Sequence, residues 1–204
     1  MVELALEAYG LKDTLRTGWV LRGIRNPESV ADHSWGTAFL CMLFGPEAGV
    51  DVGIACRIAL IHDIAECRTG DIPTRVEQSG RSFAAIEKST AERQAMDELV
   101  RLANGEVGPA GDGFADLWQL YEDRASPEAI FVRDMNLIDM CLQAYLYERG
   151  RRYDPETGAE NFPRFARLDE FFATSGPRIA TPVGRRLYDE IHARYRAVST
   201  SGSE

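Results

Sequence analysis

Apolar side chains recur at helical spacing along almost the whole chain. Phe114, Leu117, Trp118 and Tyr121 follow the i, i+3, i+4, i+7 spacing of a one-sided helix. The sequence contains no alternating apolar and polar runs joined by a two-residue hairpin turn, so no sheet is predicted. The pattern predicts helices over residues 2–14, 27–45, 52–67, 82–103, 112–124, 127–149, 163–174 and 182–197.

Some of these helices begin with the same signal, a capping side chain followed by proline. The dipeptides are Asn26-Pro27, Ser126-Pro127 and Thr181-Pro182. The cap oxygen accepts a free backbone N–H, and proline at the first helical position removes an N–H that has no partner there. We therefore expect a helix to start at each of these points.

The loops are too short and too mixed in composition to separate domains. We therefore predict an all-α fold with one domain over residues 1–198, a bundle of roughly 7–9 helices. The last residues, 199–204, are small and polar, and we expect them to form a disordered tail.

Composition narrows the range of partners. The chain is 45% hydrophobic and 27% charged, as in soluble globular proteins, and its net charge is -9. This negative charge argues against nucleic acid or an anionic membrane as the main partner, because phosphate groups attract basic surfaces. It leaves room for a small phosphorylated substrate, which needs only a local positive pocket or a metal ion.

The cysteines and the N-terminal segment indicate a location in the cell. Cys41, Cys56, Cys67 and Cys141 form no C-x-x-C pair, and we expect free thiols in a reducing compartment. The N-terminal segment carries acidic residues and lacks the features of a signal peptide. No stretch reaches the about 18 apolar residues of a membrane span. The expected location is the cytoplasm.

The dipeptide His62-Asp63 lies inside an apolar helical run. An imidazole nitrogen and a carboxylate oxygen are good ligands for divalent metals, and burying both without a partner is costly. Glu66 follows one turn beyond His62, and His33 lies on a separate predicted helix, three residues after Val30. These residues indicate a metal site, although a histidine on an apolar face can also be a hydrogen-bonded core residue.

Several segments occur in the order found in one superfamily. They are Arg16-Thr17-Gly18-Trp19-Val20, Pro27 to Ser34, His62-Asp63-Ile64-Ala65-Glu66, Thr69-Gly70-Asp71-Ile72-Pro73, Glu87-Lys88 to Ala95-Met96, and Phe131 to Ala144. From about residue 10 to residue 150 the chain resembles the HD-domain metal-dependent phosphohydrolases. It looks most similar to the branch with bacterial 5′-deoxynucleotidases and eukaryotic HD-domain-containing relatives.

The resemblance implies an HD-domain helical bundle that holds one divalent metal ion, of Co, Mn, Mg, Zn or Fe. His33, His62 and Asp63 match the metal ligands of the family. The implied substrate is a (deoxy)nucleoside 5′-monophosphate or a similar small phosphomonoester, and the relatives imply a homodimer. The metal would polarise a phosphoryl oxygen and acidify a bound water.

The resemblance also implies roles for other residues, each with a structural alternative. Glu66 is the expected general acid or base, or else a solvated or salt-bridged glutamate. Asp71 would orient the attacking water, or else stabilise its turn through an Asx hydrogen bond. Arg16 would contact phosphate, or else be a surface arginine. Trp19 would stack on a base or sugar, or else belong to the core or an interface.

One position departs from the family pattern. Asn136 lies seven residues before Gln143, where the relatives carry the last metal aspartate. Asn136 can bind the metal through its neutral amide oxygen, or Asp139, three residues on, can supply a carboxylate in its place. In the relatives an acidic residue often already occupies the position of Asp139. A third possibility is a metal-poor site.

These readings leave three classes of function. The first is a phosphohydrolase, the second is a nucleotide-binding or regulatory homologue whose catalysis is weakened or lost because of Asn136, and the third is a purely structural helical protein. Phosphodiester and triphosphate hydrolysis also remain open on this type of scaffold. The sequence has no Gly-rich phosphate loop and no G-x-S-x-G motif, so other hydrolytic chemistries do not compete.

Overall fold

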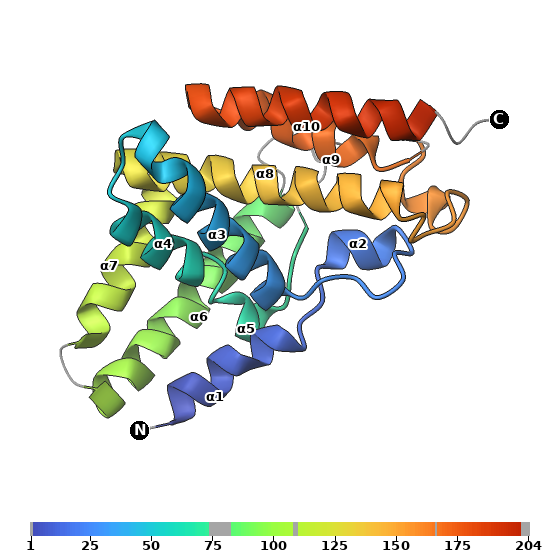
Figure 1. Ribbon diagram of the computed structural model, residues 1–204. Coiled ribbons are helices and arrows are strands. Elements are labelled where there is room, and N and C mark those ends of the chain that lie inside the picture. Colours follow the sequence, from blue (N-terminus) through green and yellow to red (C-terminus); the bar gives the residue numbers. More distant parts are fainter. Residues whose placement is uncertain (1, 74–82, 108–109, 166, 201–204) are drawn as a thin grey trace.

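The computed structural model describes residues 2–73, 83–107, 110–165 and 167–200, and Figure 1 shows their arrangement. The elements are α1 (Glu3–Tyr9), η1 (Gly10–Lys12), α2 (Thr17–Leu21), α3 (Val30–Ala48), α4 (Val52–Ile61), α5 (Glu66–Thr69), α6 (Phe83–Val107), α7 (Ala110–Asp123), α8 (Pro127–Arg149), η2 (Ala159–Asn161), α9 (Asp169–Ser175), η3 (Gly176–Arg178) and α10 (Pro182–Thr200), where η marks a 3-10 helix.

The predicted all-α class is confirmed. Within the described ranges, strand-like pairing is limited to one isolated bridge between Leu15 and Ser29. None of the helices in these ranges combines the length and the apolar character that a membrane span requires.

Helix α8 is the centre of the larger hydrophobic core. It packs against α3, α4 and α10, and Figure 1 shows α10 lying along it. Its residues Phe131, Met135 and Ile138 are fully buried, together with Ile58 of α4 and Tyr195 of α10. Each large apolar side chain buried in this way contributes roughly 1.5–3 kcal/mol of transfer free energy, so α8 is held firmly in place.

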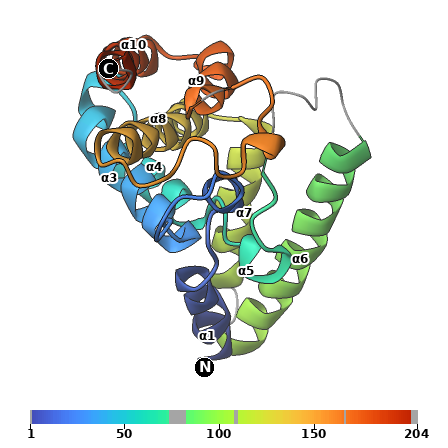
Figure 2. The ribbon, with the colours of Figure 1, turned by 90° about the vertical axis from the view of Figure 1, so that its right-hand side faces the viewer.

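A smaller hydrophobic cluster joins α1, α3, α6 and α7. It contains Leu11, Val30, Ile64, Leu99 and Trp118, among others. In Figure 2, α1 lies at the bottom of the molecule, while α9 and α10 lie at the top.

The residues His62 and Asp63 lie where these two clusters meet. Ile58 and Ala59, just before the dipeptide, belong to the larger core, and Ile64, just after it, belongs to the smaller cluster. The packing of both neighbours therefore holds this short segment in place.

Two of the predicted helix starts are confirmed and one is wrong. Ser126 caps α8 by accepting the N–H of Ala129, and the Thr181 hydroxyl oxygen accepts the N–H of Gly184 at the start of α10. Helix α3 begins three residues after Pro27 instead, because Ser29 and Asp32 form a reciprocal capping box there.

The predicted helix over residues 52–67 is divided. Helix α4 ends at Ile61 and α5 begins at Glu66, and the backbone N–H of Glu66 donates to the carbonyl of Asp63 at 3.0 Å. This three-residue spacing is tighter than that of an α-helix and interrupts its regular hydrogen bonding. As a result His62 and Asp63 lie in a turn, not in the middle of a helix.

Other boundaries also differ from the prediction. Helix α2 was not predicted, and α9 begins at Asp169, later than residue 163. Helix α10 extends to Thr200, so the first two residues of the predicted tail are helical, while residues 201–204 lie outside the described residues. The domain boundaries at 1–198 stay a prediction.

Candidate metal centre

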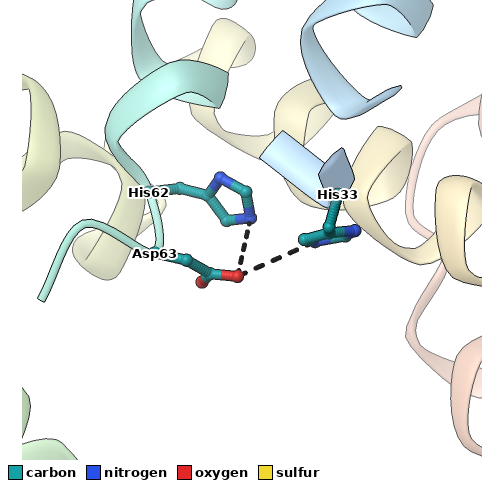
Figure 3. A group of neighbouring side chains, drawn as sticks. All are labelled: His33, His62 and Asp63. Carbon is teal, nitrogen blue, oxygen red and sulfur yellow. Dashed lines mark ion pairs between the residues drawn. The ribbon is translucent and has the colours of Figure 1, made fainter. Parts of the chain in front are cut away.

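His33, His62 and Asp63 converge on one point. The Oδ2 atom of Asp63 lies 3.3 Å from Nε2 of His62 and 3.7 Å from Nε2 of His33 (Figure 3). His33 comes from the first turn of α3, and the other two come from the turn after α4. The packing of α3 against α4 brings these distant parts of the sequence together.

The outer nitrogen of each imidazole is already engaged. The Nδ1 atom of His62 lies 2.7 Å from the carbonyl oxygen of Ala59, and Nδ1 of His33 lies 2.7 Å from Oδ2 of Asp139. The carbonyl of Ala59 can only accept, so Nδ1 of His62 carries the proton and donates it. Burial raises the pKa of Asp139 to about 7, and its ionised carboxylate accepts the proton of Nδ1 of His33. In a neutral imidazole this leaves a lone pair on Nε2, the atom that faces Asp63.

The electrostatics of the centre favour a neutral histidine beside an ionised carboxylate. Burial, followed by the charge of Arg16, lowers the pKa of His33 to about 3. Burial raises the pKa of Asp63, but His62 and Arg16 outweigh it and hold that pKa well below its ordinary value. Neutral imidazole and ionised carboxylate are the states that bind a metal.

These donor atoms fit a divalent cation. Within the described part of the chain, the buried Nε2 atoms of His33 and His62 have no hydrogen-bond partner. When both imidazoles are neutral, as metal binding requires, two lone pairs and a carboxylate oxygen face one another, an arrangement that is costly for buried acceptors. A cation among the three removes this cost.

Asp139 contacts His33 from behind. It binds Nδ1, while the converging atoms of the centre face Nε2. The structure therefore does not place Asp139 where the alternative reading required it, as a replacement metal ligand. Its carboxylate instead orients the imidazole and increases its basicity, as partners of metal-binding histidines commonly do.

We expect Asp139→Ala to weaken metal affinity by about 10–100-fold, because the His33 ring loses the acceptor that orients it. Metal titration followed by calorimetry measures this effect. The Asp139→Asn variant keeps an acceptor oxygen and should recover much of the affinity. Unchanged affinity in the alanine variant would contradict the orienting role.

Asn136 reaches the same cavity as His62 and Asp63 from α8. Its amide nitrogen donates a hydrogen bond to the hydroxyl of Tyr121 at 2.7 Å, and the Tyr121 ring lies 5.1 Å from the His62 ring. Because the amide N–H is used in this way, the amide oxygen is left as the atom able to bind a metal. Tyr121 was seen in the sequence only as part of an apolar stripe.

Glu66 is buried beside the centre. Its side chain is 2% exposed, and Oε2 has no hydrogen-bond partner among the described residues. Burial, and then the charges of Asp63 and Asp71, raise its pKa to about 10. Glu66 is therefore not a solvated glutamate, and the buried carboxyl can hold a proton. Its ion pair with Lys88 agrees with the salt-bridged alternative.

Two cations lie near Glu66. Nζ of Lys88 is 3.7 Å from Oε1, and Nη1 of Arg16 is 4.0 Å from Oε2. Lys88 also donates to the carbonyl of Ile72. The sequence placed Lys88 in a family-like segment but assigned it no role, because nothing in the spacing showed that α6 would face α5.

Arg16 and Asp71 form one network with Asp63. Nη1 of Arg16 lies 3.3 Å from Asp63 and 3.2 Å from Asp71, so Arg16 is not the free surface arginine of the alternative reading. Asp71 also accepts the backbone N–H of Thr17 at 2.6 Å. Burial lowers the pKa of Arg16, but Asp71 and Asp63 outweigh it and raise that pKa above its ordinary value.

Trp19 is a buried residue of the cavity wall. It is 1% exposed, its indole N–H donates to Glu28 at 2.8 Å, and its ring centre lies 4.0 Å from that of Phe171. The face that a base would need is therefore covered, which supports the core alternative. Phe171 and Phe162, which were not among the candidate residues, line the cavity beside it.

The centre opens into a cavity of about 240 Å³. Charged residues surround the end near Asp63, and aromatic and aliphatic residues form the end near Trp19. The aliphatic wall includes Leu137 and Met140 of α8. A cavity with a charged end and an apolar end suits a small molecule that has both characters.

The structure is thus that of an all-α protein with a candidate metal centre, formed by two buried histidines and a carboxylate that face one another. A family model described as HD domain matches residues 8–170, and the chain belongs to this family.

Named relatives cover most of the chain. The human 5′-deoxynucleotidase HDDC2 is 34% identical over 195 residues, which span 95% of this chain and 86% of the relative. A crystal structure of a Pyrococcus horikoshii OT3 protein has a TM-score of 0.68 and 30% identity, covering 96% and 99% of the two chains. A structure named predicted metal-dependent phosphohydrolase, from Magnetospirillum magnetotacticum MS-1, has a TM-score of 0.67 and 25% identity, covering 98% and 92%.

Proposed function

We propose that this chain is a metal-dependent phosphohydrolase that removes phosphate from a (deoxy)nucleoside 5′-monophosphate or a similar small phosphomonoester. The observation that carries the proposal is the convergence of two unpartnered imidazole nitrogens and Asp63 beside the buried carboxyl of Glu66. The name of the human relative, a 5′-deoxynucleotidase, supports the substrate class.

His33, His62 and Asp63 would hold one divalent ion of Co, Mn, Mg, Zn or Fe, with the amide oxygen of Asn136 as a neutral fourth ligand. A bound ion would polarise a phosphoryl oxygen and make a nearby water more acidic. It would also add a positive charge beside Glu66 and so favour its ionised form.

The side chains around the centre have distinct tasks in this proposal. Glu66 accepts the proton of the attacking water and passes it toward the leaving oxygen. Arg16 lies next to Asp63 and offers guanidinium donors to the phosphate. Asp71 holds Arg16 and the start of α2 in place, and in this position it can orient the water.

The cavity wall explains why a nucleotide suits the site. With the phosphate at the charged end, the nucleoside extends toward Phe162 and Phe171, which offer apolar contact area. Trp19 supports this wall from behind through its contact with Phe171.

A phosphate-release screen tests the proposal directly. The full chain is loaded separately with Co²⁺, Mn²⁺, Mg²⁺, Zn²⁺ or Fe²⁺ and incubated with a panel of ribo- and deoxynucleoside 5′-monophosphates. Turnover with at least one ion supports the hydrolase. A complete absence of turnover with every ion, in protein that binds metal and nucleotide, favours the binding or regulatory homologue instead.

The hydrolase and the binding or regulatory homologue differ in how strongly position 136 helps to hold the metal, so a change at Asn136 tests this point. In Asn136→Asp we expect metal to bind about tenfold tighter or more, corresponding to about 1.4 kcal/mol, because a carboxylate adds a negative charge to the ligand set. Metal titration of both proteins measures the change. Equal affinity in the two proteins would show that position 136 does not contact the ion.

We also propose that the chain forms a homodimer through one face of α3. Trp35, Phe39, Met42 and Leu43 recur at helical spacing and are exposed, with Trp35 66% exposed. Trp35 and Phe39 stack with ring centres 5.4 Å apart. An exposed apolar face of this kind is typical of an interaction surface. Light scattering should report a dimer for the wild type and a monomer for Trp35→Glu, and a monomeric wild type would contradict the proposal.

The remaining expectations concern location and other partners. All four cysteines are free, which supports the cytoplasm as a reducing location. The net charge of -9 supports a small phosphorylated substrate over nucleic acid or a membrane surface. Fractionation of cells expressing the tagged chain tests the location.

A further inference from the structure

Two arginines line the cavity of the metal centre without belonging to that centre. Arg133 comes from α8 and Arg178 from the end of η3. Arg133 lies three residues before Asn136 and therefore on nearly the same face of α8. The two arginines come from different elements, and the fold brings both to the same cavity, where the charge of Arg133 acts on Arg178.

Neither guanidinium has a fixed anionic partner. Among the described residues, no hydrogen bond or ion pair within 4.0 Å engages Arg133 or Arg178. Glu122 acts on Arg133 from beyond that distance, and Arg133 also lies 5.9 Å from the centre of the Tyr121 ring. Arg178 is an exposed residue, and desolvation of its guanidinium, followed by the positive charges of Arg133 and Arg124, lowers its pKa.

Helix α8 contributes several residues to the cavity wall. Arg133, Asn136 and Met140 line the cavity in this order along α8. A rise of about 1.5 Å per residue separates Arg133 from Met140 by about 10 Å along the helix axis. A nucleoside on the Met140 side of Asn136 therefore leaves the arginine side for another group.

We propose that Arg133 and Arg178 form a second anion subsite that binds a phosphate group other than the one at the metal centre. Guanidinium groups match phosphate oxygens with paired N–H donors, and a phosphate between the two arginines removes their mutual repulsion. The phosphate has two possible sources, the inorganic phosphate that is released or a second phosphoryl group of the substrate. The role of this subsite in a reaction rests on the proposed function, but the binding of phosphate to it does not require turnover.

Binding to the full chain in the presence of a chelator tests the subsite, because turnover is then absent. Inorganic phosphate is titrated by calorimetry into the wild type, Arg133→Gln, Arg178→Gln and the exposed control Arg101→Gln on α6. We expect the phosphate affinity of each cavity variant to fall by about tenfold or more, and the affinity of the control to match that of the wild type. Circular dichroism confirms that each variant is folded.

Nucleotides identify the source of the phosphate. If dADP binds about tenfold tighter than dAMP, and the Arg133→Gln/Arg178→Gln double variant loses this preference, the subsite holds a second phosphoryl group. Equal binding of the two nucleotides, with arginine-dependent phosphate binding, assigns it to the released phosphate. No phosphate binding by the wild type, or equal binding by the cavity variants, overturns the subsite. Arginine-dependent binding without any turnover of the metal-loaded chain contradicts the proposed function alone.

Discussion

In the His62→Ala variant, we expect metal binding and phosphate release to fall together. The variant removes one of two imidazole nitrogens that face Asp63, and the ion loses a direct ligand. The loss of affinity should exceed the about 10–100-fold that follows from losing a residue that only orients a ligand. Metal content after dialysis and calorimetric titration measure this effect, and phosphate release measures its consequence.

The third histidine provides a matched control. His192 lies on α10 and stacks on Phe172, with ring centres 4.8 Å apart, away from the metal centre. His192→Ala should keep the metal content and the turnover of the wild type. If His62→Ala retains its metal as well as His192→Ala does, the ligand set proposed here is wrong.

Replacing Glu66 by glutamine should separate metal binding from chemistry. Glutamine keeps the size of the side chain but cannot accept a proton from water, so we expect kcat to fall by about 10²–10⁴-fold. Metal binding should change far less, because Glu66 is not among the converging donor atoms. Steady-state kinetics on metal-loaded protein, with metal content measured on the same samples, provide both quantities.

A glutamate on the surface serves as the comparison for Glu66. Glu190 is exposed on α10 and pairs with Arg194, and Glu190→Gln should leave kcat unchanged. A nearly unchanged kcat in Glu66→Gln would remove Glu66 from the proton-transfer role. A parallel loss of metal would indicate instead that Glu66 helps to hold the ion.

Helix α8 presents Arg133 and the neutral Asn136 to the cavity. An aspartate at position 136 would place a carboxylate three residues from Arg133, on the same helical face. The asparagine therefore leaves the α8 wall more positive, which favours an anion there and weakens the hold on a metal.

Local sequence signals predicted most of the helices and the identity of the central residues. Helical periodicity identified α7, α8 and α10 because their apolar faces repeat over several turns. The proline signal failed at Asn26-Pro27, where Asn26 adopts a φ of 51° and Ser29 provides the cap. Short elements such as α2 were missed because five residues carry too little periodicity.

The sequence could also identify His62 and Asp63, because adjacent metal-capable residues in an apolar run stand out against their surroundings. It could not show which nitrogen of each histidine would be free. That depends on the acceptors Ala59 and Asp139, and Asp139 reaches His33 only because α3 packs against α8.

By itself, then, the sequence determined the helical class, the family and the residue types available for a metal site, since these depend on local spacing and side-chain chemistry. The tertiary structure decided how those residues are used. It buried Trp19 beneath Phe171, put Asp139 behind His33, and brought Arg178 to the cavity of Arg133. The reason is physical: helical spacing fixes which face a side chain occupies, but the packing of helices against one another decides what that face meets.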